Sequence, residues 1–120
     1  MLKLVSIALS VVSIFVFSVE FALARSYDQT YIRASFYSSG HRTASGERFN
    51  PNGYTAASRT LPFGTRLHVT NPATGRSVIV RINDRGPFIR GRGLDLARGA
   101  AVALGMVRQG TAVLRVIRLN

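Results

Sequence analysis

Cysteine is absent from this sequence of 120 residues, and only two of its residues are histidine. The chain therefore has no disulfide framework, cysteine nucleophile, thiolate metal site or lipidated N-terminal cysteine. Two histidines are too few for a zinc site with three histidine ligands. No cofactor motif is recognisable, so we expect neither a metal nor an organic cofactor. The length fits at most one domain.

The first residues have the pattern of a secretory signal peptide. Lys3 precedes an apolar run over residues 4–19 that only serines interrupt, and Ala22-Leu23-Ala24 matches an A-x-A cleavage site. We predict a signal peptide over residues 1–24 and export to the periplasm or cell envelope, with no stable membrane anchor after cleavage. A retained transmembrane anchor is the alternative, although the apolar run is short for a bilayer and Glu20 ends it.

Acidic side chains are scarce. Asp and Glu total 5 against 16 Lys and Arg, so the formal net charge is +11. Lys3 is the one lysine, so every cation beyond the signal peptide is an arginine, whose guanidinium makes bidentate contacts with carboxylate and phosphate. An exported basic protein meets anionic envelope polymers before DNA, so we do not expect a nucleic-acid partner. A solvated basic surface without a specific partner is the alternative.

Alternating apolar and polar residues predict a small, mainly β protein. We expect strands over residues 31–37, 54–57, 65–70, 77–82 and 112–119, long loops over 38–52 and 83–93, and one helix over 96–106. In the hairpin around residues 71–75, the inward side chains should be those of Leu67, Val69, Val78, Val80 and Ile82, and the outward ones those of Arg66, His68 and Arg81. Short strands with one helix favour a small β-barrel, but the pattern alone does not separate barrel types.

Three acidic residues, Glu47, Asp84 and Asp95, lie beside Gly, Pro or Asn in loop-like segments. Cleavage of a glycosidic bond needs a carboxylic acid that protonates the leaving oxygen. A lytic reaction needs no water, because the same carboxylate can take the proton of a sugar hydroxyl that attacks within the sugar. One well-placed Asp or Glu can therefore suffice.

Each of these acids also has a purely structural interpretation. Asp84 can close an Asx-turn after its strand, and Asp95 can cap the predicted helix. Glu47 can simply balance Arg48 in an exposed loop.

Aromatic and imidazole side chains add weaker candidates. His68 lies at an outward strand position, whereas His41 lies in the long loop near Glu47 and is the better functional candidate. Tyr37 and Phe88 either belong to the core or stack on a sugar ring.

Several blocks of the sequence, in order, resemble the rare lipoprotein A (RlpA) family. They are Ala34-Ser35-Phe36-Tyr37 and residues 42–49, residues 55–65, residues 69–71 with 75–88 (which include Asn83-Asp84-Arg85-Gly86-Pro87-Phe88), and residues 91–97 with 100–106. The match extends from about residue 34 to 119. A lone Asn-Asp-Arg-Gly would be a weak signal, but consecutive blocks over nearly the whole mature chain are highly specific.

The resemblance implies a six-stranded double-psi β-barrel over residues 34–119 with one or two short helices, preceded by a lead-in at 25–33. It also implies a periplasmic lytic transglycosylase that cuts peptidoglycan glycan strands and prefers strands without stem peptides. By position, Glu47 and Asp84 match the family's catalytic acids, and Asp95 matches an acid shared with expansin-like barrels. We expect Asp95, His41, Tyr37, Arg85 and Phe88 to contact the glycan.

The sequence departs from the family's pattern in three ways. Ser58 replaces a catalytic-site histidine, so its side chain can form hydrogen bonds but cannot carry a charge. The loop before Arg42 is shorter than usual, which predicts a more open cleft. Neither a lipobox cysteine nor a C-terminal glycan-binding SPOR domain is expected. Two hypotheses follow: an enzyme with Asp84 as general acid and base, Glu47 holding geometry or charge and Ser58 a weak polar substitute, or a non-catalytic, expansin-like glycan-binding module.

Overall fold

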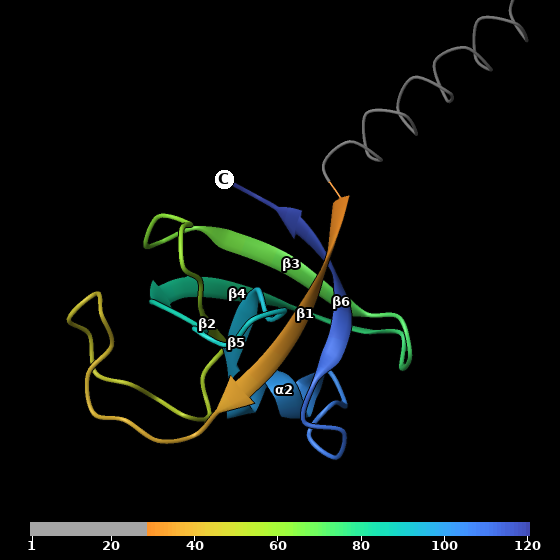
Figure 1. Ribbon diagram of the computed structural model, residues 1–120, viewed down its shortest axis with the longest axis horizontal. Helices are drawn as coiled ribbons and strands as arrows, with labels where there is room; N and C mark the ends of the chain where they lie inside the picture. The colour runs from red at the N-terminus through yellow and green to blue at the C-terminus, as the bar shows by residue number, and fades with distance from the viewer. Residues whose placement is uncertain (1–28) are drawn as a thin grey trace, which may run out of the picture.

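The computed structural model describes residues 29–120, so the predicted signal peptide and its cleavage site lie outside the described residues. Six strands, β1 (Gln29–Tyr37), β2 (Thr55–Ala57), β3 (Arg66–Asn71), β4 (Arg76–Asp84), β5 (Leu94–Ala97) and β6 (Ala112–Arg118), close into a barrel in the order β1-β5-β2-β4-β3-β6 (Figure 1). The helix α2 (Arg98–Ala103) follows β5 and packs against β1, β4 and β5. No helix within residues 29–120 is long and apolar enough to cross a membrane.

The β3–β4 hairpin has the predicted alternation. Leu67 pairs with Val80 and Val69 pairs with Val78, and all of these except the half-buried Val78 are almost completely buried. The turn is closed by the carbonyl of Asn71, which accepts hydrogen bonds from Thr74 and Gly75. Gly75 has a φ of +73°, a conformation that glycine adopts without steric cost. Arg66 and Arg81 face solvent and His68 is half-buried, as their outward positions predict.

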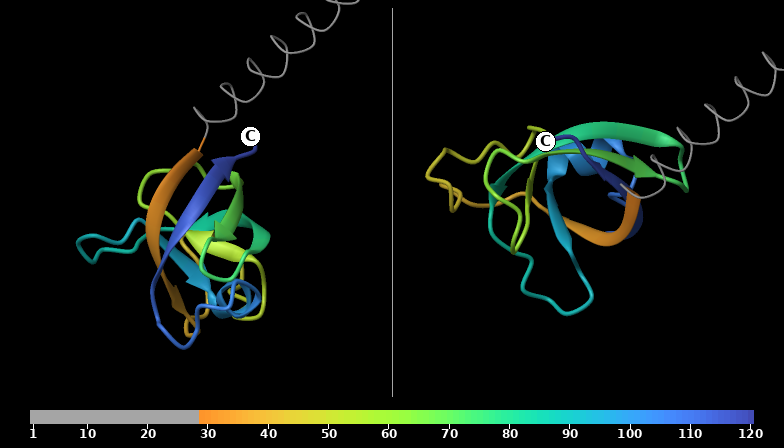
Figure 2. Two further views of the ribbon diagram at one scale, coloured as in Figure 1. Left: turned by 90° about the vertical axis from the view of Figure 1, so that its right-hand side faces the viewer. Right: turned by 90° about the horizontal axis from the view of Figure 1, so that it is seen from above.

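The barrel interior forms a single apolar core. It is filled mainly by Leu67, Val69, Val80, Ile82, Leu94, Leu96, Leu104, Met106, Leu114 and Val116, each at most 3% exposed. Each of β3, β4, β5 and β6 supplies two of these large side chains, whereas β1 and β2 supply the smaller Ala34 and Ala56. The loops between β1 and β2 and between β4 and β5, which carry Glu47 and Phe88, extend from this barrel (Figure 2).

The helix predicted over residues 96–106 is wrong in its extent. Residues 94–97 form β5, which pairs with both β1 and β2, and α2 is only 6 residues long. Pairing on both sides buries Leu94 and Leu96 completely. This burial favours a strand over residues 94–97, although the adjoining Ala-rich segment has a high helix propensity. Asp95 is therefore a strand residue, and Ala97 occupies the N-cap position without a side-chain hydrogen bond.

Two strands are longer than predicted. β1 begins at Gln29, inside the segment expected to be a lead-in, because this end of the strand pairs with β6 through Gln29 and Ile117. β4 extends to Asp84, two residues into the predicted loop, because Asp84 pairs with Ala57 of β2. The extension of β4 places Asp84 at the end of a paired strand.

Candidate active site

Asp84 is held at the end of β4 by donors from three segments. The hydroxyl of Tyr37 donates to Oδ2 at 3.0 Å, and the backbone N–H groups of Ala44 and Arg85 donate to Oδ1 at 2.9 Å each. Tyr37 ends β1, and Ala44 belongs to the loop between β1 and β2. The carboxylate therefore has a fixed orientation in which both of its oxygens are acceptors.

Tyr37 connects Asp84 to Phe49 of the loop between β1 and β2. Its ring stacks on Phe49 with centroids 4.6 Å apart and an interplanar angle of 11°. Burial raises the pKa of the Tyr37 hydroxyl, and so do the hydrogen bond to Asp84 and the negative charges of Asp84 and Asp95. The hydroxyl therefore stays protonated and donates. Tyr37, expected to contact the glycan, offers its hydroxyl to Asp84 and one ring face to Phe49.

Asp95 lies in the same cross-strand row as Asp84. Asp84 of β4 pairs with Ala57 of β2, Ala57 pairs with Asp95 of β5, and Asp95 pairs with Ser35 of β1. Strands two apart are separated by roughly 10 Å, and in this row the small side chain of Ala57 lies between the two acids. The hydroxyl of Ser35 donates to Asp95 at 2.9 Å.

The pKa of Asp95 is raised. Burial is the main cause and the charge of Asp84 adds to it, while the hydrogen bond from Ser35 and the charge of Arg92 oppose it. Asp95 therefore holds a proton more readily than an exposed aspartate. Ser35, which the sequence did not single out, lies in the first block of the family resemblance.

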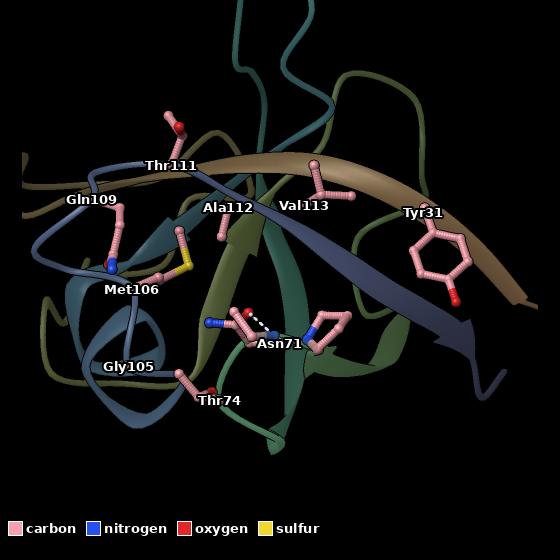
Figure 3. Close-up of a pocket in the computed structure, with 11 residues that line it drawn as sticks. Tyr31, Asn71, Thr74, Gly105, Met106, Gln109, Thr111, Ala112 and Val113 are labelled. Carbon is pink, nitrogen blue, oxygen red and sulfur yellow. Dashed lines mark hydrogen bonds between the residues drawn. The ribbon is translucent and has the colours of Figure 1, made fainter.

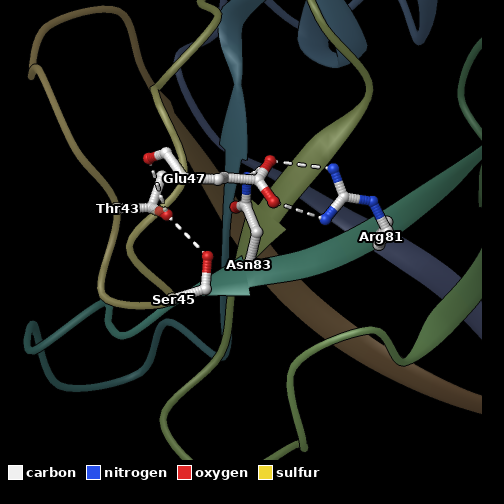
Figure 4. A network of polar contacts seen from close by, with 5 residues as sticks. All are labelled: Thr43, Ser45, Glu47, Arg81 and Asn83. Carbon is white, nitrogen blue, oxygen red and sulfur yellow. Dashed lines mark hydrogen bonds and ion pairs between the residues drawn. The ribbon is translucent and has the colours of Figure 1, made fainter.

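Glu47 is the centre of a separate polar network (Figure 4). Both nitrogens at the end of the Arg81 guanidinium donate to its carboxylate at 2.8 Å, and the amide of Asn83 donates at 2.8 Å. The hydrogen bonds from Arg81 and then Asn83 lower the pKa of Glu47 to about 2. Glu47 therefore stays ionised and fastens the loop to β4. Its partner is Arg81, not the neighbouring Arg48.

The same loop brings Glu47 and Asp84 to one end of β4. The N–H of Ala44 reaches the Asp84 carboxylate, and the N–H of Ser45 donates to the backbone carbonyl of Asn83 at 3.2 Å. Asn83 is 1% exposed, and its Oδ1 has no hydrogen-bond partner among the described residues.

Ser58 turns its side chain away from this row of acids. Its Oγ accepts hydrogen bonds from the N–H groups of Thr60 and Leu61, at 3.3 and 3.1 Å. It lines a mainly apolar hollow of about 340 Å³ that none of the three acids lines. What reaches Asp84 is the backbone of Ser58, whose N–H donates to the Asp84 carbonyl at 3.1 Å. The hydroxyl closes a turn.

Arg85 and Phe88 have different surroundings. The Arg85 guanidinium lies 4.0 Å above the ring of Phe63 and donates to the carbonyls of Ser58 and Leu61, so it braces the loop after β2. Phe88 is 81% exposed in the loop between β4 and β5, which projects from the barrel (Figure 2). Its ring is free to contact a ligand.

His41 lines a polar hollow of about 330 Å³ beside the site, together with Gly40, Arg42, Arg48 and Phe49.

A larger hollow, of about 410 Å³, lies between the β3–β4 turn and the segment before β6 (Figure 3). None of the candidate residues lines it. The side-chain amide of Asn71, which lines this larger hollow, donates a hydrogen bond to the carbonyl of Leu104 at 2.9 Å. Within residues 29–120, no three His, Asp or Glu side chains are grouped to hold a metal ion.

Comparison with known proteins identifies the barrel. A family model described as lytic transglycolase matches residues 29–116. The chain belongs to that family. An RlpA relative from Nostoc sp., named probable endolytic peptidoglycan transglycosylase, is 60% identical over 88 residues, which are 69% of this chain and 24% of the relative. One of the same name from Aquifex aeolicus is 56% identical over 85 residues, 67% of this chain and 38% of the relative. The chain thus spans well under half of these relatives, and the RlpA resemblance is confirmed.

Solved structures of other proteins with this barrel confirm the double-psi fold. An expansin from Clavibacter michiganensis has a TM-score of 0.64 at 24% identity, covering 77% of this chain and 50% of that chain. A Streptomyces papain inhibitor has a TM-score of 0.63 at 17% identity, covering 77% of this chain and 94% of that chain. Because these names describe different activities, the shared barrel alone does not define a function.

Proposed function

We propose that this domain is a lytic transglycosylase that acts in the cell envelope after export and cleaves peptidoglycan glycan strands, preferably those without stem peptides, leaving anhydro-sugar ends. Its family and the names of its RlpA relatives support the reaction class. The observation that carries the proposal is the pair of carboxyl groups aligned across Ala57, in which Asp84 accepts three hydrogen bonds and Asp95 accepts one, from Ser35.

The two carboxyl groups suit opposite proton transfers. Asp95, with its raised pKa, donates a proton to the glycosidic oxygen as the bond from that oxygen to the anomeric carbon breaks. Asp84, an acceptor at both oxygens, takes the proton of the sugar hydroxyl whose oxygen bonds to the same carbon. A proton passed from Asp84 back to Asp95 restores the starting state, and no water is consumed. Glu47, ionised and paired, positions the loop that supplies the Ala44 donor.

Mass analysis of the soluble products tests this proposal. Sacculi treated with an amidase to remove stem peptides are incubated with the protein, and the fragments are examined for anhydro ends. Anhydro ends support lytic cleavage, whereas reducing ends would indicate hydrolysis with water. No fragments at all, with sacculus binding retained, would overturn the enzymatic proposal.

The second candidate is a non-catalytic module that binds or loosens the wall. It is favoured by Ser58, which replaces the family histidine and uses its hydroxyl for a turn. A fold relative with this barrel, a variant of the Clavibacter michiganensis expansin, was solved in complex with cellohexaose. The variant Ser58→His separates the candidates: increased release of anhydro fragments supports an enzyme limited by the missing imidazole, and binding without release in both proteins supports the module.

A further inference from the structure

Two arginines line the hollow beside the candidate site, and few hydrogen-bond acceptors balance their guanidinium groups. Arg42 and Arg48 both belong to the loop between β1 and β2, and no acidic side chain lines the hollow. Within residues 29–120 the Arg48 side chain has no hydrogen-bond or ion-pair partner. Arg42 donates to the uncharged carbonyl of Gly46 at 2.9 Å. Most of the N–H groups of the two guanidiniums are therefore unused.

The backbone places these two arginines directly opposite each other. They form an antiparallel bridge, flanked by the hydrogen bonds Phe49 N–H to His41 carbonyl and Thr43 N–H to Glu47 carbonyl, both 2.9 Å. This is the non-hydrogen-bonded type of pair, in which the Cα atoms lie about 4.5 Å apart and the side chains share one face. Like charges in such a pair are destabilising.

The neighbouring acid does not relieve this repulsion. Glu47 is adjacent to Arg48 in sequence, yet both of its oxygens face Arg81. A local arrangement that costs stability without a compensating contact is expected at functional positions. A bound anion would offset the repulsion between these two guanidinium groups.

The hollow shares a wall with the candidate reaction centre. Phe49 lines the hollow and stacks on Tyr37, and the Tyr37 hydroxyl holds Asp84. A polymer that crosses Asp84 in the direction of Phe49 would place a neighbouring unit over Arg42 and Arg48.

We propose that Arg42 and Arg48 bind the free lactyl carboxylate of an N-acetylmuramic acid in the glycan strand. This inference rests on the proposed glycan substrate. The lactyl carboxylate is the one anionic group of the repeating disaccharide, and guanidinium groups bind carboxylates through paired charge-assisted hydrogen bonds. A stem peptide is joined to that carboxylate as an amide, which removes this charge and adds bulk. The two arginines therefore select strands without peptides at this position.

The test uses strands whose lactyl carboxylates are intact or reduced to alcohols. Binding is measured in the Asp84→Asn chain, so that cleavage does not deplete the probe. We expect intact strands to bind at least about tenfold more tightly than reduced strands, and this ratio to fall toward one in Arg48→Gln and in Arg42→Gln/Arg48→Gln. Arg48→Gln breaks no side-chain hydrogen bond or ion pair within the described residues, so it also covers the case in which the double variant does not fold.

Exposed Arg108 provides the matched control. It belongs to the segment between α2 and β6, which lies on the other side of the barrel from the loop between β1 and β2 (Figure 1). Arg108→Gln removes the same charge and should keep the full discrimination.

The outcomes separate this inference from the proposed function. Equal binding of intact and reduced strands by the parent chain overturns the carboxylate site, even where wild-type protein releases anhydro fragments. Discrimination that survives in Arg48→Gln and in the double variant also overturns it. Discrimination lost with Arg48, in a protein that releases no anhydro fragments, keeps the carboxylate site and rejects the enzyme.

Discussion

Glu47 and Asp84 lie against the same end of β4, yet the structure treats them differently. Glu47 forms the one ion pair among residues 29–120 and its pKa falls to about 2. Asp84 and Asp95 receive their hydrogen bonds from uncharged groups, a phenol, a hydroxyl and backbone N–H groups. Chemically similar acids thus become a structural anchor in one region and, in the function that we propose, a proton-transfer pair in the other. Four variants test this contrast, from the largest expected effect to the smallest.

Asp84→Asn should abolish strand cleavage while the fold and sacculus binding persist. Asparagine keeps the shape of aspartate, and its oxygen can still accept from Ala44 and Arg85, but it cannot accept a proton at neutral pH. We expect a loss of about 10²–10⁴ in rate, measured by release of anhydro fragments from peptide-stripped strands. Equal release by wild type and variant would remove Asp84 from the mechanism.

Asp95 should dominate the pH dependence. Because its pKa is raised and the protonated form is the proposed donor, the cleavage rate should fall as rising pH removes that proton. In Asp95→Asn the cleavage rate should drop by about 10² or more, and this limb of the pH profile should vanish. Sacculus binding over the same pH range is the control. An unchanged limb in the variant contradicts the assignment.

Tyr37→Phe should reduce turnover about 2- to 10-fold, the worth of one hydrogen bond to Asp84. Phenylalanine keeps the stack on Phe49, so the melting temperature should change little. A positioning role predicts a lower kcat with KM unchanged on peptide-stripped strands. A raised KM with normal kcat would instead favour direct contact between Tyr37 and the glycan.

Glu47→Gln should have the smallest effect, on stability. The Glu47–Arg81 pair is partly exposed, and such pairs contribute at most about 1 kcal/mol. Because the folded-state pKa of Glu47 is lowered, its contribution is present above the unfolded value of 4.5 and is lost as pH falls toward about 2. Denaturant unfolding of wild type and variant should therefore differ at pH 7 and converge near pH 2. A difference that persists at pH 2 would contradict the ionic origin.

Local patterns predicted those parts of the molecule that depend on neighbouring residues. The β3–β4 hairpin was predicted because its period of two and its turn residues agree. The strand β5 was not, because Leu94-Asp95-Leu96-Ala97 is too short to show a period and continues directly into the Ala-rich helix. Its strand conformation depends on pairing with β1 and β2, which are distant in the sequence.

For the candidate site, too, local sequence patterns predicted some features, and long-range contacts created the others. The motif blocks predicted Asp84 and Glu47 as site residues, which remains a prediction, but did not predict the atoms that hold them. The bond from Tyr37 to Asp84 spans 47 residues and exists only once the barrel is closed. The outward position of Arg81 was predicted correctly, whereas its pairing with Glu47 depends on how the long loop folds back onto β4.

The position of β6 between β1 and β3 determines when the barrel can be completed. The first strand pairs with the last, as Gln29 with Ile117, so the closing contacts join the two ends of the described residues 29–120. Such long-range pairing is slow, because loop-closure entropy is lost before the contacts form. A chain synthesised from its N-terminus cannot complete the barrel until its final strand has emerged. Until then the barrel lacks its closing strand, and an open barrel of this kind is compatible with the export that we propose.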